Sequence, residues 1–256
     1  MLLPRLPIAD PVILAVGKGG RFCHRGPGMS SHSFDSVVTG RRSIRGFTPG
    51  PVPKALIAEI IALAMRAPSS LNTQPWNFTV VTGAPLDRIR ADNTERNLAG
   101  VPSSREFRTQ GDYAGAHRER QIGIAKQLFG AMGIERDDKA ARTDWVLRGF
   151  RQFDAPVSIV VTYDRSIHGS DIAPFDCGAV TNALVNAAWS RGLGCVINSQ
   201  GIMQSPVVRQ HAGIAEDQVI MICVAMGWPD DDFPANGVVS TRKSVDEAVV
   251  FVGFDD

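Results

Sequence analysis

The chain has few of the features that mark metal-binding, membrane-spanning or nucleic-acid-binding proteins. Its 256 residues include 4 cysteines, scattered at Cys23, Cys177, Cys195 and Cys223 without a CxxC pair. This spacing disfavours a zinc site, so we predict no metal and expect buried thiols in a reducing cytoplasm. No apolar run approaches the roughly 20 residues of a membrane helix. The net charge of +1 likewise predicts neither nucleic acid nor an acidic membrane as a partner.

The N-terminal segment carries the apolar run PVILAV, followed by the polar and glycine-rich stretch GKGGRFCHRGPG. The run is too short for a membrane helix and lacks the cleavage pattern of a signal peptide. We therefore predict a poorly ordered extension over residues 1–30. The remaining residues, 31–256, show no break in composition and are predicted to form one domain. A composition of 44% hydrophobic residues is enough to bury a substantial core.

Hydrophobic periodicity predicts a mixture of helices and strands without a regular βαβ alternation. Helices are expected at 33–40, 52–68 and 176–194, with Asp176 as the cap of the last one. Strands are expected at 77–83, 156–164 and 218–229, and the segment 85–151 has a helical pattern. We therefore predict an α+β fold in which one sheet carries helices on both faces. The apolar C-terminal stretch AVVFVGF must pack on another surface.

The segment GRRSIRGF, residues 40–47, places Arg41, Arg42 and Arg45 around Ser43, beside apolar residues that favour burial. These guanidinium groups repel one another unless water or an anion separates them. Guanidinium binds phosphate through paired hydrogen bonds, and the serine hydroxyl adds a donor. On its own, the segment is somewhat better explained as a solvated basic turn.

The segment RAPSSLNTQPW, residues 66–76, follows a helix that Pro68 ends, and it is rich in polar side chains. Its hydroxyl and amide groups could bind the imide edge of a flat heterocycle. The alternative is an ordinary polar turn. The side chains that carry this hypothesis are Ser69, Ser70, Asn72, Thr73 and Gln74.

Two further segments have weaker signals. RGLGCVINSQG, residues 191–201, ends a helix at glycine and leads into a polar loop, which is also typical of a helix-to-strand connection. It lacks GxGxxG, so a Rossmann site is not indicated. STRKS, residues 240–244, contributes Arg242, which alone would be a surface charge.

Taken together, these four segments resemble the FMN-dependent nitroreductase family from about residue 34 to residue 254. The strings RRSIR and APSSLNTQPW are specific in combination, and FDAPVSIVV and AMGWPDDDFPAN resemble later family segments. The resemblance implies a three-layer α/β/α sandwich with a central, mostly antiparallel sheet. It also implies a homodimer with FMN at the dimer interface.

The resemblance also implies which residues contact FMN. The first arginines would meet its phosphate and ribityl chain, Ser43 and Arg45 the pyrimidine edge, and Arg242 the phosphate. The loop from Ile197 to Gln200 would lie along the isoalloxazine, and a polar segment would reach the FMN from the partner subunit. The implied set is Arg41, Arg42, Ser43, Arg45, Pro68, Ser69, Ser70, Asn72, Gln74, Ile197, Asn198, Ser199, Gln200 and Arg242.

The function implied is hydride transfer from NAD(P)H, with NADPH slightly favoured, through FMN to nitroaromatic or quinone acceptors in a cytoplasmic enzyme. Substrate and nicotinamide would take turns at the flavin, which is a ping-pong mechanism. The flavin carries the chemistry, so no catalytic side chain is predicted. The alternatives are a same-fold reductive dehalogenase or flavin-fragmenting enzyme, or a non-catalytic FMN-binding or storage protein.

Overall fold

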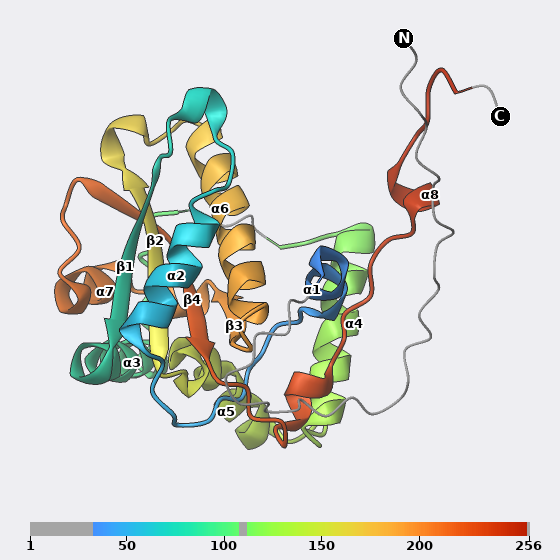
Figure 1. Ribbon diagram of the computed structural model, residues 1–256. Helices are drawn as coiled ribbons and strands as arrows, with labels where there is room; N and C mark the ends of the chain where they lie inside the picture. The colour runs from blue at the N-terminus through green and yellow to red at the C-terminus, as the bar shows by residue number, and fades with distance from the viewer. Residues whose placement is uncertain (1–32, 108–111, 255–256) are drawn as a thin grey trace, which may run out of the picture.

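The computed structural model describes residues 33–107 and 112–254, and the predicted extension over residues 1–30 lies outside this range (Figure 1). Four strands form the sheet: β1 (Trp76–Thr82), β2 (Val157–Asp164), β3 (Gly194–Asn198) and β4 (Gln218–Gly227). Their order is β1-β2-β4-β3, and each neighbouring pair is antiparallel. The three strands predicted from periodicity are confirmed to within two residues at each end.

Helices cover both faces of this sheet (Figure 1). On one face, α2 (Lys54–Ala64) and α6 (Ile172–Trp189) pack together over Ile159 and Val161 of β2. On the other, α3 (Gly83–Leu98) and α7 (Ser205–Ala212) enclose Val160. Successive side chains of a strand point to opposite faces, so β2, which is buried from Val157 to Tyr163, serves both cores. The predicted three-layer α/β/α sandwich with an antiparallel sheet is confirmed.

The cap predicted for the long helix is wrong. Helix α6 begins at Ile172, with Asp171 at the N-cap position, and Asp176 lies inside the helix. Asp176 is buried, and its carboxylate accepts a hydrogen bond from the Ser70 amide at 3.0 Å. Two aspartates near a helix start both satisfy the local preference for an acidic cap. The tertiary hydrogen bond to Ser70 favours the position of Asp176 inside the helix.

The middle segment contains two further helices, α4 (Gly115–Ala131) and α5 (Lys139–Phe150), as its helical pattern predicts. The first helix of the described residues is the predicted short helix α1 (Phe34–Gly40), and the last is α8 (Val245–Ala248). Beyond α8 the apolar residues Val250, Phe251 and Phe254 are exposed, and the segment extends away from the sheet (Figure 1). The part of the chain that the structure describes also contains five short 3₁₀ segments: η1 (Ser70–Asn72), η2 (Gln152–Asp154), η3 (Arg165–Ile167), η4 (Gln200–Ile202) and η5 (Pro234–Gly237).

Three of the cysteines confirm the expectation of buried free thiols. Cys177, Cys195 and Cys223 are buried and unpaired, whereas Cys23 lies outside the described residues. Burial raises the pKa of Cys177 and Cys223 to about 12. In the described part of the chain, no helix combines the length and apolarity needed to cross a membrane. The same residues contain no group of three or more His, Cys, Asp or Glu side chains that could hold a metal.

Candidate functional site

The arginine segment is anchored along the edge of the sheet. Ser43 forms an isolated bridge with Cys195 of β3, and the Ile44 amide donates to the Cys195 carbonyl at 3.0 Å. Ile44 is fully buried against Gly194, where a Cβ would lie 2.6 Å from Ile44 Cγ1. The apolar residues of GRRSIRGF therefore fix a backbone that carries the charged ones.

Asn236, which follows the last strand, holds the second half of this segment. Its Oδ1 accepts from the Arg45 amide at 2.7 Å and the Gly46 amide at 3.0 Å. Its Nδ2 donates to the Gly46 carbonyl at 2.8 Å. The side chain is only 5% exposed, so these bonds form away from water. Asn236 thus sets the direction in which the Arg45 side chain leaves the backbone.

Arg45 lines a cavity of about 280 Å³. Its guanidinium is largely buried, which lowers the pKa of Arg45, and Nη1 donates to the Ser43 carbonyl at 3.3 Å. The loop from Ile197 to Gln200 lines the same cavity. The structure therefore brings together two of the predicted segments, which are about 150 residues apart in the sequence.

Hydrogen bonds to α5 fix the loop at the end of β3. Asn198 Nδ2 donates to the Gly149 carbonyl at 2.7 Å, and its Oδ1 accepts from the Gln200 amide at 2.9 Å. Gln200 Nε2 donates to the Val146 carbonyl at 3.3 Å. The side chain of Asn198 is thereby used to shape the loop, whereas the Ile197 side chain is 49% exposed.

The rest of the cavity wall is apolar, and sequence reasoning missed it. Leu128 of α4, Trp145 of α5 and Phe153 of η2 line it. Phe153 has a φ of 56°, a left-handed backbone conformation that is uncommon for a non-glycine residue. These residues sit in the segment that carries no polar motif. An apolar wall leaves no local signature that separates it from the ordinary core.

Two other predicted arginines, Arg41 and Arg242, lie close to each other. Burial lowers the pKa of Arg41, and the charge of Arg242 lowers it further. Arg242 Nη1 donates to the hydroxyl of Ser240 at 2.7 Å. The guanidinium of Arg42 lies over the Trp189 ring, 5.9 Å from its centroid. Neighbouring cations are favourable only with an anion between them or in water, so this pair is suited to a phosphate.

The structure does not bring the polar segment 68–74 to this cavity. Ser70 binds Asp176 near the start of α6, whereas Arg42 contacts Trp189 at its end. These positions are separated by roughly 20 Å of helix axis, and the segment stands at the opposite end of α6 from β3 in Figure 1. Leu71 is 96% exposed and, like Asn72 and Gln74, has a positive φ. Within one chain, Pro68, Ser69, Ser70, Asn72 and Gln74 are therefore separate from the other predicted residues.

Comparison with known proteins identifies the family. A model of the nitroreductase family matches residues 38–228, which is most of the chain. The chain belongs to the nitroreductase family. The matched range contains the arginine segment, the segment 68–74 and both walls of the cavity, while Arg242 lies beyond it.

Individual nitroreductases match over nearly their whole length. The nitrobenzene nitroreductase of Ectopseudomonas oleovorans is 34% identical over 227 residues, covering 87% of this chain and 98% of that protein. The 4-nitrobenzoate reductase of Pseudomonas putida is 32% identical over 235 residues, covering 89% and 99%. The FMN and NADPH-dependent nitroreductase NfnB from Sphigopyxis sp. strain HMH has a similar structure. It gives a TM-score of 0.82 at 30% identity, covering 87% of this chain and 100% of that chain.

Proposed function

We propose that this nitroreductase binds FMN and uses NADPH to reduce nitroaromatic compounds. The observation that carries this proposal is the convergence of Arg45 and the Ile197–Gln200 loop on one cavity. Family membership and the FMN and NADPH dependence named for NfnB support it. Quinones as further acceptors, a ping-pong order of substrates and a cytoplasmic location belong to the same proposal.

The residues present fit FMN chemically. The Arg41–Arg242 pair would hold the terminal phosphate. Arg45 would lie at the pyrimidine edge, where its positive charge favours the extra electrons of the reduced state. The apolar wall of Leu128, Trp145 and Phe153 would exclude water beside the ring. When bound, FMN would accept a hydride from NADPH and pass the electrons to a nitro group.

The experiment that tests the function is steady-state turnover of the FMN-loaded protein with NADPH and a panel of nitroaromatic compounds. Nitrobenzene and 4-nitrobenzoate are the first acceptors to try, because these substrates are named for its relatives. The proposal expects NADPH consumption that depends on the nitro compound, with reduced nitrogen products. NADPH consumption that is indifferent to every nitro compound would contradict it, and a halogenated acceptor in the panel would reveal dehalogenation.

The phosphate pair gives a prediction about cofactor selectivity. FMN is expected to bind at least about tenfold more tightly than riboflavin, because each charge-assisted contact to its phosphate contributes at least that factor. Arg242→Gln should reduce this preference, as measured by fluorescence titration of the FMN-free protein with each flavin. Lys243→Gln, at the neighbouring position, is the matched control and should keep the preference. Equal affinity of the unmodified protein for both flavins would remove the phosphate from this site.

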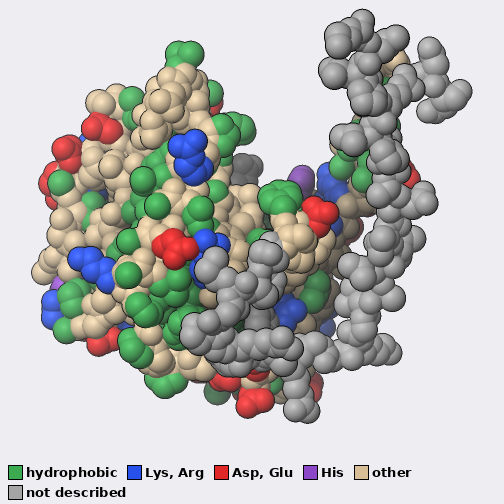
Figure 2. All heavy atoms as spheres, viewed as in Figure 1, with side chains coloured by type: hydrophobic (Ala, Val, Ile, Leu, Met, Phe, Trp, Pro, Cys, Tyr) green, Lys and Arg blue, Asp and Glu red, His purple; other side chains and the backbone are tan. Residues whose placement is uncertain are grey.

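We further propose that the protein works as a homodimer in which the segment 68–74 completes the partner's FMN site. The distance of this segment from the cavity supports the proposal, because its exposed polar groups have no FMN to contact within their own chain. Exposed apolar side chains, among them Leu63, Met65 and Leu71, also occur on the face that bears α2 and this segment. Figure 2 shows apolar side chains gathered on that face. The exposed C-terminal residues beyond α8 would cover a partner surface of this kind.

Mixing two impaired variants tests this sharing. Arg45→Ala disables the cavity side, and Asn72→Ala with Gln74→Ala disables the exposed segment. In a mixed dimer one site carries both defects and the other carries none. Co-expression should therefore restore roughly a quarter of the unmodified activity for random pairing in a two-fold dimer. Sedimentation should show dimers, and a monomer that keeps full FMN occupancy at low concentration, or the absence of restored activity, would refute the sharing.

A further inference from the structure

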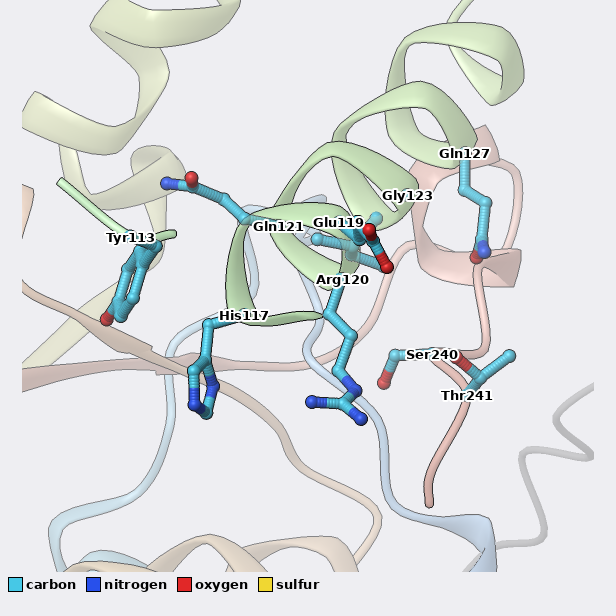
Figure 3. A pocket seen from close by; sticks show the side chains of 10 residues that line it. Tyr113, His117, Glu119, Arg120, Gln121, Gly123, Gln127, Ser240 and Thr241 are labelled. Carbon is cyan, nitrogen blue, oxygen red and sulfur yellow. The ribbon is translucent and has the colours of Figure 1, made fainter. Parts of the chain in front are cut away.

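A second and larger cavity, of about 610 Å³, lies beside the N-terminal half of α4. The C-terminal segment forms its other wall through Ser240 and Thr241 (Figure 3). None of the residues predicted to contact FMN lines it. The lining includes the cation Arg120, the imidazole of His117 and the phenol of Tyr113. The cavity therefore offers charge-assisted and neutral hydrogen-bond donors on two walls.

The helical periodicity of α4 places its charged side chains at different angles around the helix axis. His117, Arg120 and Ile124 are spaced three and four residues apart, which places them on one face. Figure 3 shows the side chains of His117 and Arg120 leaving α4 in the same direction, with Ser240 and Thr241 beside Arg120. The acid Glu119 also lines the cavity, turned by roughly 100° around the helix from Arg120. The side of the cavity that His117 and Arg120 face is therefore the one suited to an anion.

One of the two acids of α8 in the C-terminal segment is already engaged. The carboxylate of Glu247 accepts a hydrogen bond from the Ser244 amide at 2.9 Å in the capping box of α8. Its pKa is lowered first by the bonds from Ser244 and then by the charges of Arg120 and Lys243. Arg120 is thus one of several cations in this region, together with Lys243 and the Arg41–Arg242 pair.

The same helix connects the two cavities. Ile124 and Gln127 line the larger one, and the next residue, Leu128, lines the smaller one beside Arg45. From His117 to Leu128 the axis of α4 advances by about 16 Å. A ligand that spans both cavities must be long, with an aromatic ring at one end and an anionic group at the other. A nicotinamide dinucleotide has this form, since two riboses and a pyrophosphate separate its two bases.

We propose that the larger cavity binds the adenosine half of NADPH and that Arg120 and His117 contact its 2′-phosphate. This rests on the function proposed above, in which NADPH reaches the flavin in the smaller cavity. The guanidinium of Arg120 can bind two phosphate oxygens at once, and the hydroxyls of Ser240 and Thr241 supply further donors. NADH lacks the 2′-phosphate, so these side chains set the preference between the two nicotinamides.

The kinetic test uses FMN-loaded Arg120→Gln and His117→Gln. The KM for NADPH should rise about tenfold or more in Arg120→Gln, with a smaller rise in His117→Gln, because a charge-assisted contact is lost. The KM for NADH should change less than twofold. Arg118→Gln is the matched control, since the Arg118 guanidinium bonds Gln121 at 2.6 Å and does not line the cavity. An equal rise in KM for NADH and NADPH would overturn the proposal.

A binding measurement decides the proposal independently of turnover. In calorimetric titration of the FMN-loaded protein, 2′,5′-ADP should bind at least about tenfold more tightly than 5′-AMP, and Arg120→Gln should remove that difference. Equal binding of the two nucleotides to the unmodified protein would overturn the assignment. So would a selective loss of FMN from Arg120→Gln, which would place the cavity in the flavin phosphate site. Failure of nitroaromatic reduction would overturn the proposed function and leave this titration as a separate result.

Discussion

Arg45→Ala is expected to lower the reduction potential of the bound FMN and to slow its reduction by NADPH about tenfold or more. The Arg45 guanidinium is largely buried at the cavity. In Arg45→Ala, little water is therefore present to stabilise the negative charge of the reduced flavin in its place. A charge-assisted contact contributes roughly 1.5–3 kcal/mol, which for a two-electron couple corresponds to about 30–65 mV if it is specific to the reduced state. The potential is measured by equilibration with reference dyes on fully loaded protein.

The conservative variant Arg45→Lys separates charge from geometry. It keeps a cation near the same position, so it should lower the reduction potential less than Arg45→Ala does. It loses the planar, two-pronged set of donors of the guanidinium. If Arg45 only stabilises the turn through its bond to the Ser43 carbonyl, the alanine variant would melt earlier and keep its potential. An unchanged midpoint potential in fully loaded Arg45→Ala would therefore remove Arg45 from the flavin site.

Asn236→Ala is expected to reduce the free energy of unfolding by about 3 kcal/mol, because it leaves two backbone amides without partners in a buried place. These are the amides of Arg45 and Gly46, whereas the Gly46 carbonyl keeps its bond from the Asp230 amide at 3.1 Å. The same change loosens the segment that carries Arg45, so FMN affinity should fall as well. Urea unfolding of the FMN-free protein and fluorescence titration with FMN measure the two effects separately.

Asn77→Ala is the matched control for this prediction. Asn77 is exposed, and its side-chain amide donates a hydrogen bond to Gln218 Oε1 at 3.0 Å. This bond lies near one end of the sheet, and the cavity wall formed by α5 lies near the other end. Its loss should change the free energy of unfolding by less than about 0.5 kcal/mol, as for most surface substitutions. If Asn236→Ala unfolded at the same urea concentration as Asn77→Ala, the role assigned to the Asn236 bonds would be wrong.

The sequence predicted the sheet well because its strands serve two cores. Five of the eight residues of β2 are apolar, among them the run Ile159–Val161, which is a strong signal for a strand buried on both faces. Arg45 and the Ile197–Gln200 loop, which the resemblance assigns to the flavin, line one cavity in the structure. Whether they contact FMN stays a prediction, as do the roles of Arg41, Arg42 and Arg242.

Other features depend on tertiary contacts that no local pattern reveals. The position of Asp176 inside α6 follows from its bond to Ser70, more than 100 residues earlier in the chain. Trp145 and Phe153 line the cavity only because α5 and η2 fold back over the loop after β3. His117 and Arg120 have no motif around them, and their cavity exists because the C-terminal segment passes beside α4. Each of these is a property of packing between distant segments.

The most direct test of the central claim is an anaerobic stopped-flow experiment in two steps. FMN-loaded protein is first mixed with NADPH while the flavin absorbance is followed, and the reduced protein is then mixed with 4-nitrobenzoate. We expect NADPH to bleach the flavin rapidly and the nitro compound to restore its colour without further NADPH. Flavin that NADPH leaves oxidised, or reduced flavin that no nitro compound reoxidises, would contradict the account.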